Sequence, residues 1–132
     1  ETAFEKQVAL RFTTVYGEGA RANMFIPKLL NHELEYVTLH QRDFIHVNDV
    51  IEAIVLLMSN DIRLLKPAYD IGTGKVNTVQ ELSLTAGYDL PVKDGAACEA
   101  HNNMADITEL TKLGWKPKTD VNEYIIKQTI PH

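Results

Sequence analysis

Residues 41–53 read Gln41-Arg42-Asp43-Phe44-Ile45-His46-Val47-Asn48-Asp49-Val50-Ile51-Glu52-Ala53, and this stretch decides the fold. The run from Phe44 to Val47 is mostly apolar and predicts a short strand. Asp49 and Glu52 lie three residues apart, much as in a capping box, and predict that a helix begins here. Because Val50 to Met58 contain only Glu52 as a polar residue, we expect this helix to be buried on most sides.

Strands are predicted on both sides of that unit. Val8 to Tyr16 are rich in β-branched and aromatic residues, and Ala68 to Ile71 run into a Gly-Thr-Gly turn. Tyr36 to Leu39 alternate weakly between apolar and polar residues and predict one more short strand. Strands that alternate with helices indicate an α/β fold with some parallel pairing.

Capping signals predict the remaining helices. Thr78 and Glu81 form a full capping box, and Gly87 limits their helix to about two turns. Similar acidic signals recur twice further along the chain, and Gly114 suits the C-terminal cap of the first of these two helices. We therefore expect short helices that begin near Met24, Thr78, Asp106 and Asp120.

Composition limits the classes of function. The chain has 132 residues, enough for one domain with a core, and its net charge of −5 disfavours nonspecific binding to nucleic acid or anionic membranes. Its longest apolar stretch is far shorter than the ~20 residues that a membrane span needs. Cys98 is the only cysteine, so no intrachain disulfide can form. We therefore expect a cytoplasmic protein that binds neither nucleic acid nor membranes.

Common catalytic and cofactor motifs are not found in the sequence. Gly72-Thr73-Gly74 fails the dinucleotide fingerprint because Asn77 stands where the third glycine would be needed, so we expect an ordinary tight turn. Cys98 has only His101 nearby, which does not support a nucleophilic triad. The histidines lack metal-ligand spacing, so we predict no metal site. His46 is interpreted as a hydrogen-bonded structural residue.

Two arginines are candidates for binding an anion. Arg42 and Arg21 each lie at a loop beside an ordered element, and a guanidinium is a planar fork that can bind phosphate through two hydrogen bonds at once. An ion pair at the surface, with Asp43 or a nearby glutamate, fits the same residues equally well. The residue types alone therefore leave both interpretations open.

Five segments, in order and at sensible spacing, resemble the second half of the extended short-chain dehydrogenase/reductase family. These enzymes epimerise or dehydrate nucleotide-sugars, and the Thr-Val-Tyr-Gly form of the first segment is most similar to UDP-glucuronate 4-epimerases. The resemblance covers nearly the whole chain, from about residue 8 to 126. The segments are Leu10 to Gly17, Arg21 to Pro27, Arg42 to Ala53, Tyr69 to Leu82 and Ala105 to Pro117.

The resemblance implies a fold, a ligand and a set of contacts. We expect partial Rossmann-type sheet elements together with the small substrate-binding lobe of the family. The expected ligand is a UDP-sugar or a similar nucleotide-sugar, with Arg42 on its diphosphate and Arg21 in the same substrate loop. Thr14 and Tyr16 are expected at the nucleotide-sugar site as well. NAD is the cofactor of the family.

The departures from the family pattern concern catalysis. The sequence contains neither the glycine-rich turn that binds NAD nor the Tyr-x-x-x-Lys pair that moves protons, and no arginine lies within Lys93 to Glu99. Hydride transfer needs a bound nicotinamide, and proton transfer needs a positioned base. We therefore interpret residues 1–132 as a single domain that corresponds to the C-terminal portion of such an enzyme, without its NAD-binding region.

Two functions follow from this interpretation. In the first, the chain is the nucleotide-sugar-binding portion of an epimerase or dehydratase and is not catalytically competent alone. In the second, it is a structural or oligomerising relic of the fold with no retained ligand. Because most of the family's sheet has no counterpart here, strand edges and an apolar helix would stay uncovered. We therefore predict a homodimer or a higher oligomer.

Overall fold

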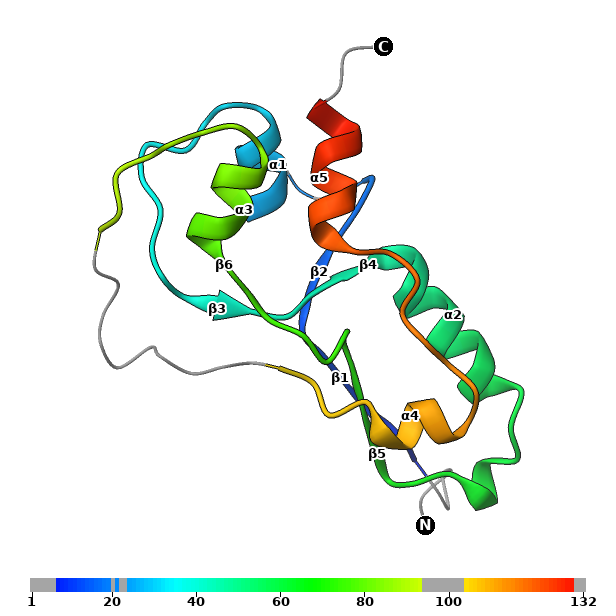
Figure 1. Ribbon diagram of the computed structural model, residues 1–132. Helices are drawn as coiled ribbons and strands as arrows, with labels where there is room; N and C mark the ends of the chain where they lie inside the picture. The colour runs from blue at the N-terminus through cyan, green and yellow to red at the C-terminus, as the bar shows by residue number, and fades with distance from the viewer. Residues whose placement is uncertain (1–6, 20, 22–23, 94–103, 130–132) are drawn as a thin grey trace.

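The computed structural model describes residues 7–19, 21, 24–93 and 104–129 (Figure 1). It confirms an α/β fold in which short helices and parallel strands are mixed. In chain order the elements are β1 (Ala9–Phe12), β2 (Thr14–Tyr16), α1 (Phe25–Leu30), β3 (Gln41–Arg42), β4 (Phe44–His46), α2 (Val47–Met58), η1 (Ile62–Leu64), β5 (Ala68–Ile71), β6 (Asn77–Thr78), α3 (Val79–Thr85), α4 (Thr108–Lys112) and α5 (Val121–Thr129).

The predicted first strand is divided into two at Thr13. β1 pairs in parallel with β5, and β2 pairs in parallel with β4. The Thr13 amide donates to the Ile71 carbonyl at 3.1 Å, whereas the Thr14 amide donates to the Asp43 carbonyl at 3.0 Å. Neighbouring amides of a strand point to opposite edges, so the chain changes partner here from β5 on one side to β4 on the other.

Helix α2 begins earlier than the sequence predicted. His46 is its N-cap, and the His46 Nδ1 accepts a hydrogen bond from the Asn48 amide at 3.1 Å. The prediction that Asp49 caps the helix was wrong because its carboxylate is buried and points to another segment. That carboxylate accepts from the amides of Lys118 and Thr119 at 3.1 and 3.0 Å, and so ties α2 to the chain that leads into α5.

The burial of α2 also differs from the prediction. Val50, Ala53 and Leu57 are buried, but a stripe on the other side is open to solvent. Ile51 is 51% exposed, Val55 59% and Met58 80%. These residues are spaced by four and three positions, so they form one apolar face along the helix. A nearly continuous apolar run could not show which side would lack a neighbour.

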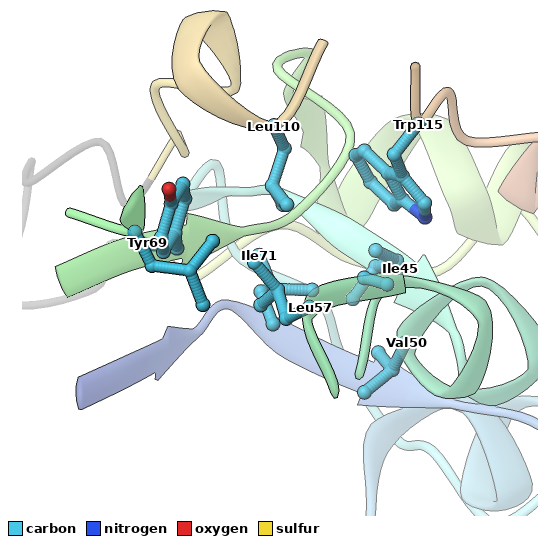
Figure 2. Close-up of a cluster of buried hydrophobic side chains, with 9 residues drawn as sticks. Ile45, Val50, Leu57, Tyr69, Ile71, Leu110 and Trp115 are labelled. Carbon is cyan, nitrogen blue, oxygen red and sulfur yellow. The ribbon is translucent and has the colours of Figure 1, made fainter. Parts of the chain in front are cut away.

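The main hydrophobic core lies where α2, α4 and the strands β4 and β5 meet. Figure 2 shows Ile45, Ile71 and Leu110 pointing towards one another, with Trp115 beside them. The Trp115 indole nitrogen donates to the Asp49 carbonyl at 3.1 Å, so its one polar group is satisfied. A second cluster joins α1, α3 and α5 through residues such as Leu29, Leu82 and Ile125.

Most of the capping predictions are confirmed. The Thr78 hydroxyl accepts from the Glu81 amide at 3.0 Å, and α3 ends just before Gly87. The Asp120 carboxylate accepts from the Glu123 amide at 3.1 Å at the start of α5. The predicted strand at Tyr36 to Leu39 does not form; within the described ranges this segment contributes a single bridge between Val37 and Val92.

Among the described residues, no helix is both long and apolar enough to span a bilayer. Cys98 and His101, which were not predicted to form a nucleophilic centre, lie outside the described residues.

Candidate functional site

A buried carboxylate joins three segments next to Arg42. Asp43 is fully buried at the junction of β3 and β4. Its Oδ1 accepts hydrogen bonds from the Thr73 amide at 2.8 Å and the Thr73 hydroxyl at 2.7 Å. Its Oδ2 accepts from the amides of Gly74 and Ala105 at 2.9 and 3.0 Å. The carboxylate thus fixes the β5–β6 turn and the segment before α4 to the end of β3.

Close packing supports the same junction. A Cβ atom added to Gly72 would lie 2.7 Å from the Ala105 Cβ, 2.8 Å from the Asp43 Oδ2 and 2.8 Å from the Thr13 Cγ2. Contacts this short do not occur for real side chains, so only glycine lets the turn approach Asp43. The predicted tight turn at residues 72–74 is confirmed, and the structure gives its physical cause.

Arg42 lies in β3, between this junction and the antiparallel partner β6. Its pairing residue is Asn77, and its Nη1 donates to the Gln41 carbonyl at 2.9 Å. The side chain is half-buried. Asp43, which the sequence left open as an ion-pair partner of Arg42, is fully buried and accepts from Thr73, Gly74 and Ala105. The backbone of Arg42 is therefore fixed by its pairing with Asn77 in β6 and by the hydrogen bonds of the next residue, Asp43.

Arg21 and Tyr16 line one cavity of about 280 Å³, together with Glu18, Met24 and Val47. Arg21 is exposed, whereas Tyr16 is 2% exposed. Arg42 is not among the residues that line this cavity. Thr14 is half-buried and borders a separate void of about 10 Å³ beside Phe44, which is too small for a ligand. The structure therefore brings Arg21 and Tyr16 together in one cavity and Thr14 and Tyr16 together at the small void, whereas Arg42 lies on a strand of another sheet.

Tyr16 has a buried hydroxyl that finds no hydrogen-bond partner within the described part of the chain. Its ring packs edge-on against His46 and Tyr124, with centroid distances of 5.3 and 5.0 Å. Burial, and then the negative charges of Asp120 and Asp49, raise the pKa of Tyr16 well above its ordinary value. The phenol therefore stays protonated in the folded chain.

This raised pKa predicts a loss of stability in alkaline solution. Unfolding exposes Tyr16, which then ionises near its ordinary pKa of about 10, while the folded form keeps its proton. The contribution of Tyr16 to the free energy of unfolding should therefore be fully present below about pH 10. It should decrease as the pH rises above that value. Tyr16→Phe removes the unpaired hydroxyl and should reduce this decrease, leaving the contribution of Tyr124, whose pKa is also raised by burial and by the charge of Glu18. Urea unfolding at several pH values checks this, with Tyr36→Phe, at a 45% exposed position, as the control that keeps the decrease.

A larger cavity of about 420 Å³ lies between the start of α1, the segment before β3 and the start of α3. Its lining includes Phe25 and Tyr36, one lysine, Lys28, and two glutamates, Glu33 and Glu35. The Lys93 amine sits 4.5 Å from the centre of the Tyr36 ring. Val79, another lining residue, donates its amide to the carbonyl of His40 at 3.1 Å. His40 precedes Arg42 by two residues in the sequence. The aromatic residues of this cavity suit a flat ring, whereas its two glutamates do not favour an anionic group.

The described residues hold no cluster of metal ligands, and the Gly-Thr-Gly turn does not offer its amides to the pyrophosphate of a dinucleotide. Within the described ranges, no group of three or more histidine, cysteine, aspartate or glutamate side chains could hold a metal ion. The amides of Thr73 and Gly74, in the Gly-Thr-Gly turn, donate to Asp43 instead of pointing to an open anion site. The role of this turn is therefore structural: it attaches the segment between β5 and β6 to Asp43.

Sequence reasoning missed the role of Asp43 and the contact between His46 and Glu18. The prediction that His46 is hydrogen-bonded is confirmed by the bond from the Asn48 amide. The Glu18 carboxylate, 3.2 Å from the His46 Nε2, lies 28 positions away in the sequence and was not predicted. The signal for Asp43 was present, since an acid directly before an apolar strand must find donors if it is buried. Nothing in the sequence indicated which donors these would be.

Comparison with known proteins gives consistent results. The model of the NAD dependent epimerase/dehydratase family matches residues 4–72. CDP-abequose synthase of Salmonella muenchen is 26% identical over 91% of this chain. The structure of MoeE5 in complex with UDP-glucuronic acid and NAD is 31% identical, covers 94% of this chain and superposes with a TM-score of 0.72. The UDP-glucose 4-epimerase of Thermotoga maritima, solved with UDP-glucose, is 25% identical over 92% of this chain, with a TM-score of 0.70.

The chain spans less than half the length of each of these proteins. It covers 46% of the Salmonella synthase, 47% of MoeE5 and 44% of the Thermotoga epimerase. The similarity therefore concerns one continuous part of a larger fold.

Proposed function

The chain belongs to the NAD-dependent epimerase/dehydratase family, and from this premise we propose that it forms the nucleotide-sugar-binding portion of such an enzyme. In this proposal Arg42 contacts the diphosphate, Arg21 contributes a second cation, and Thr14 and Tyr16 belong to the same site. The ligand is a UDP-sugar or a closely similar nucleotide-sugar. Proteins of similar fold were solved with UDP-glucuronic acid or UDP-glucose, which supports this choice of ligand.

One observation carries the proposal: the backbone of Arg42 is held in place next to a fully buried carboxylate. Its neighbour Asp43 fixes the strand through four hydrogen bonds, and β6 pairs with it on the other side. A fixed strand sets the point from which the Arg42 guanidinium reaches out, and a guanidinium can hold two phosphate oxygens at once. The cavity of about 420 Å³ that is lined by Phe25 and Tyr36 has room for a nucleoside.

Nuclear magnetic resonance tests this placement. On addition of UDP, we expect the side-chain signals of Arg42 and Arg21 and the ring signals of Tyr36 and Phe25 to shift in a saturable manner. Signals of η1, which follows α2 in the sequence and lines neither cavity, serve as the internal control and should not move. Shifts restricted to residues away from Arg42 would contradict the proposed site.

The proposal includes that the chain alone does not catalyse the reaction of the family. The sequence has no Tyr-x-x-x-Lys pair, and Tyr16 is buried and protonated, so no residue named here can act as the base of an alcohol oxidation. NAD binding by an accompanying part of the fold belongs to the same proposal. Incubation of the chain with UDP-glucuronate and NAD should give neither reduced nicotinamide nor an epimerised sugar; either product would contradict it.

A second candidate function, a structural or oligomerising role without a ligand, is favoured by the open apolar face of α2. Ile51, Val55 and Met58 are each more than half exposed. An apolar face of this kind favours association, which supports the predicted homodimer or higher oligomer. Light scattering at micromolar concentration tests it, and a monomer would count against it. The prediction of a cytoplasmic protein, made from the lone cysteine, stays a prediction.

A further inference from the structure

His46 uses its two ring nitrogens differently: Nδ1 accepts a hydrogen bond, and Nε2 lies next to a carboxylate. Its Nδ1 accepts from the Asn48 amide at 3.1 Å and so must carry a lone pair. The proton of the neutral ring therefore sits on Nε2, which lies 3.2 Å from a carboxylate oxygen of Glu18. The His46 side chain is 6% exposed and the Glu18 side chain 69%. The buried imidazole of His46 thus contacts one carboxylate oxygen of Glu18, whose side chain is otherwise exposed.

The surrounding residues fix the position of the His46 ring. Tyr16 packs edge-on against it and Tyr124 lies at a tilt, both at a centroid distance of 5.3 Å. Gly17 fills the remaining space: a Cβ there would lie 2.7 Å from the Val47 Cγ1 and 3.2 Å from the His46 Nε2. Gly17 also has a φ of +140°, which side chains rarely adopt. The turn that carries Glu18 is therefore seated directly on His46.

The same turn lines the cavity of Arg21. Gly17, Glu18 and Gly19 border that cavity of about 280 Å³ together with Arg21. A glutamate beside an arginine in one cavity has two possible effects on an anionic ligand. When the carboxylate is held by His46, the guanidinium keeps its charge for the ligand. When the carboxylate is free, it can pair with the guanidinium and repel the anion.

We propose that His46 is a positioning residue that holds Glu18 and thereby keeps Arg21 available to the phosphate of a nucleotide. This inference rests on the proposed function of Arg21. It assigns no contact between His46 and the ligand, since the imidazole is buried behind Gly17. The effect of His46 on affinity therefore passes through the carboxylate of Glu18.

A double-mutant cycle with UDP as the probe tests this route. His46→Asn keeps the cap of α2, because asparagine is among the best N-cap residues, but its short side chain cannot reach Glu18. We expect this variant to bind UDP about fivefold more weakly, about the value of one net hydrogen bond. In a Glu18→Ala background the same substitution should leave the affinity unchanged. An equal loss in both backgrounds would show a merely structural role and would overturn the inference.

A ligand-free measurement separates this inference from the proposed function. In the unliganded chain, the Nε2-bound proton of His46 should give a resonance protected from exchange with water, and Glu18→Ala should remove that protection. Glu18→Gln keeps an acceptor oxygen and should preserve it. A resonance unchanged in Glu18→Ala would overturn the inference even if UDP binds. Loss of protection without any UDP binding would support the contact and contradict the proposed function alone.

Discussion

Asp43→Asn should lower the free energy of unfolding by roughly 2–5 kcal/mol. The substituted amide has one acceptor oxygen, which can serve the Thr73 amide and hydroxyl. Its NH₂ group then faces the amides of Gly74 and Ala105, which donate to the Asp43 carboxylate at 2.9 and 3.0 Å and lose their acceptor in the variant. Each buried donor left without an acceptor costs about 1–3 kcal/mol. Urea unfolding of the variant and the parent chain at neutral pH measures the difference.

Asp106→Asn is the matched control for this prediction. The Asp106 carboxylate also accepts from the amide and the hydroxyl of a threonine, Thr108, at 3.1 and 2.7 Å. Asp106 is exposed, and both of these bonds go to the same oxygen, Oδ1. The single side-chain oxygen of asparagine can accept both. We expect its unfolding midpoint to stay close to that of the parent chain. Similar midpoints for the two variants would mean that the Asp43 junction does not hold the fold together.

Arg42→Ala should weaken UDP binding by about 10- to 100-fold, since a hydrogen bond to a charged group contributes about 1.5–3 kcal/mol. The loss should appear in affinity and not in stability, because the Arg42 side chain donates only to the carbonyl of Gln41 among the contacts described. Arg42→Lys keeps the charge but not the planar fork, so its affinity should lie between the two. Calorimetric titration with UDP measures all three chains.

Arg63→Ala is the control for the loss of a positive charge. Arg63 pairs with Asp61 at 2.7 Å at the exposed start of η1. Its removal changes the net charge by the same amount as Arg42→Ala, and we expect UDP affinity to remain within about twofold, as for a distant surface charge screened by salt. Equal losses for Arg42→Ala and Arg63→Ala would reduce the role of Arg42 to general electrostatics.

Local sequence signals predicted the elements better than they predicted the contacts between them. The capping box at Thr78 and Glu81, the strand Ala68 to Ile71 and the acidic start of α5 all follow from neighbours in the chain, and the structure confirms them. Asp49 has the same local pattern as a cap, yet its carboxylate is drawn to the backbone of Lys118 and Thr119. A tertiary contact across almost 70 positions overrides the local preference there.

The candidate site shows the same division. A guanidinium beside a strand could be recognised from the sequence, and the resemblance to a family gave it a ligand. The rigidity of Arg42 could not be predicted, because it depends on Gly72 leaving room for the Asp43 carboxylate and on donors from Thr73, Gly74 and Ala105. The contact between His46 and Glu18 depends in a similar way on the positive φ of Gly17, which brings the turn onto the imidazole.

Calorimetric titration of the unmodified chain with UDP, with uridine in a parallel titration, tests most directly whether the chain binds a nucleotide through its phosphates. The account predicts saturable one-site binding of UDP that weakens as salt is raised, and much weaker binding of uridine, which lacks the diphosphate. No saturable heat with UDP or UDP-glucuronate, or equal affinity for UDP and uridine, would contradict it.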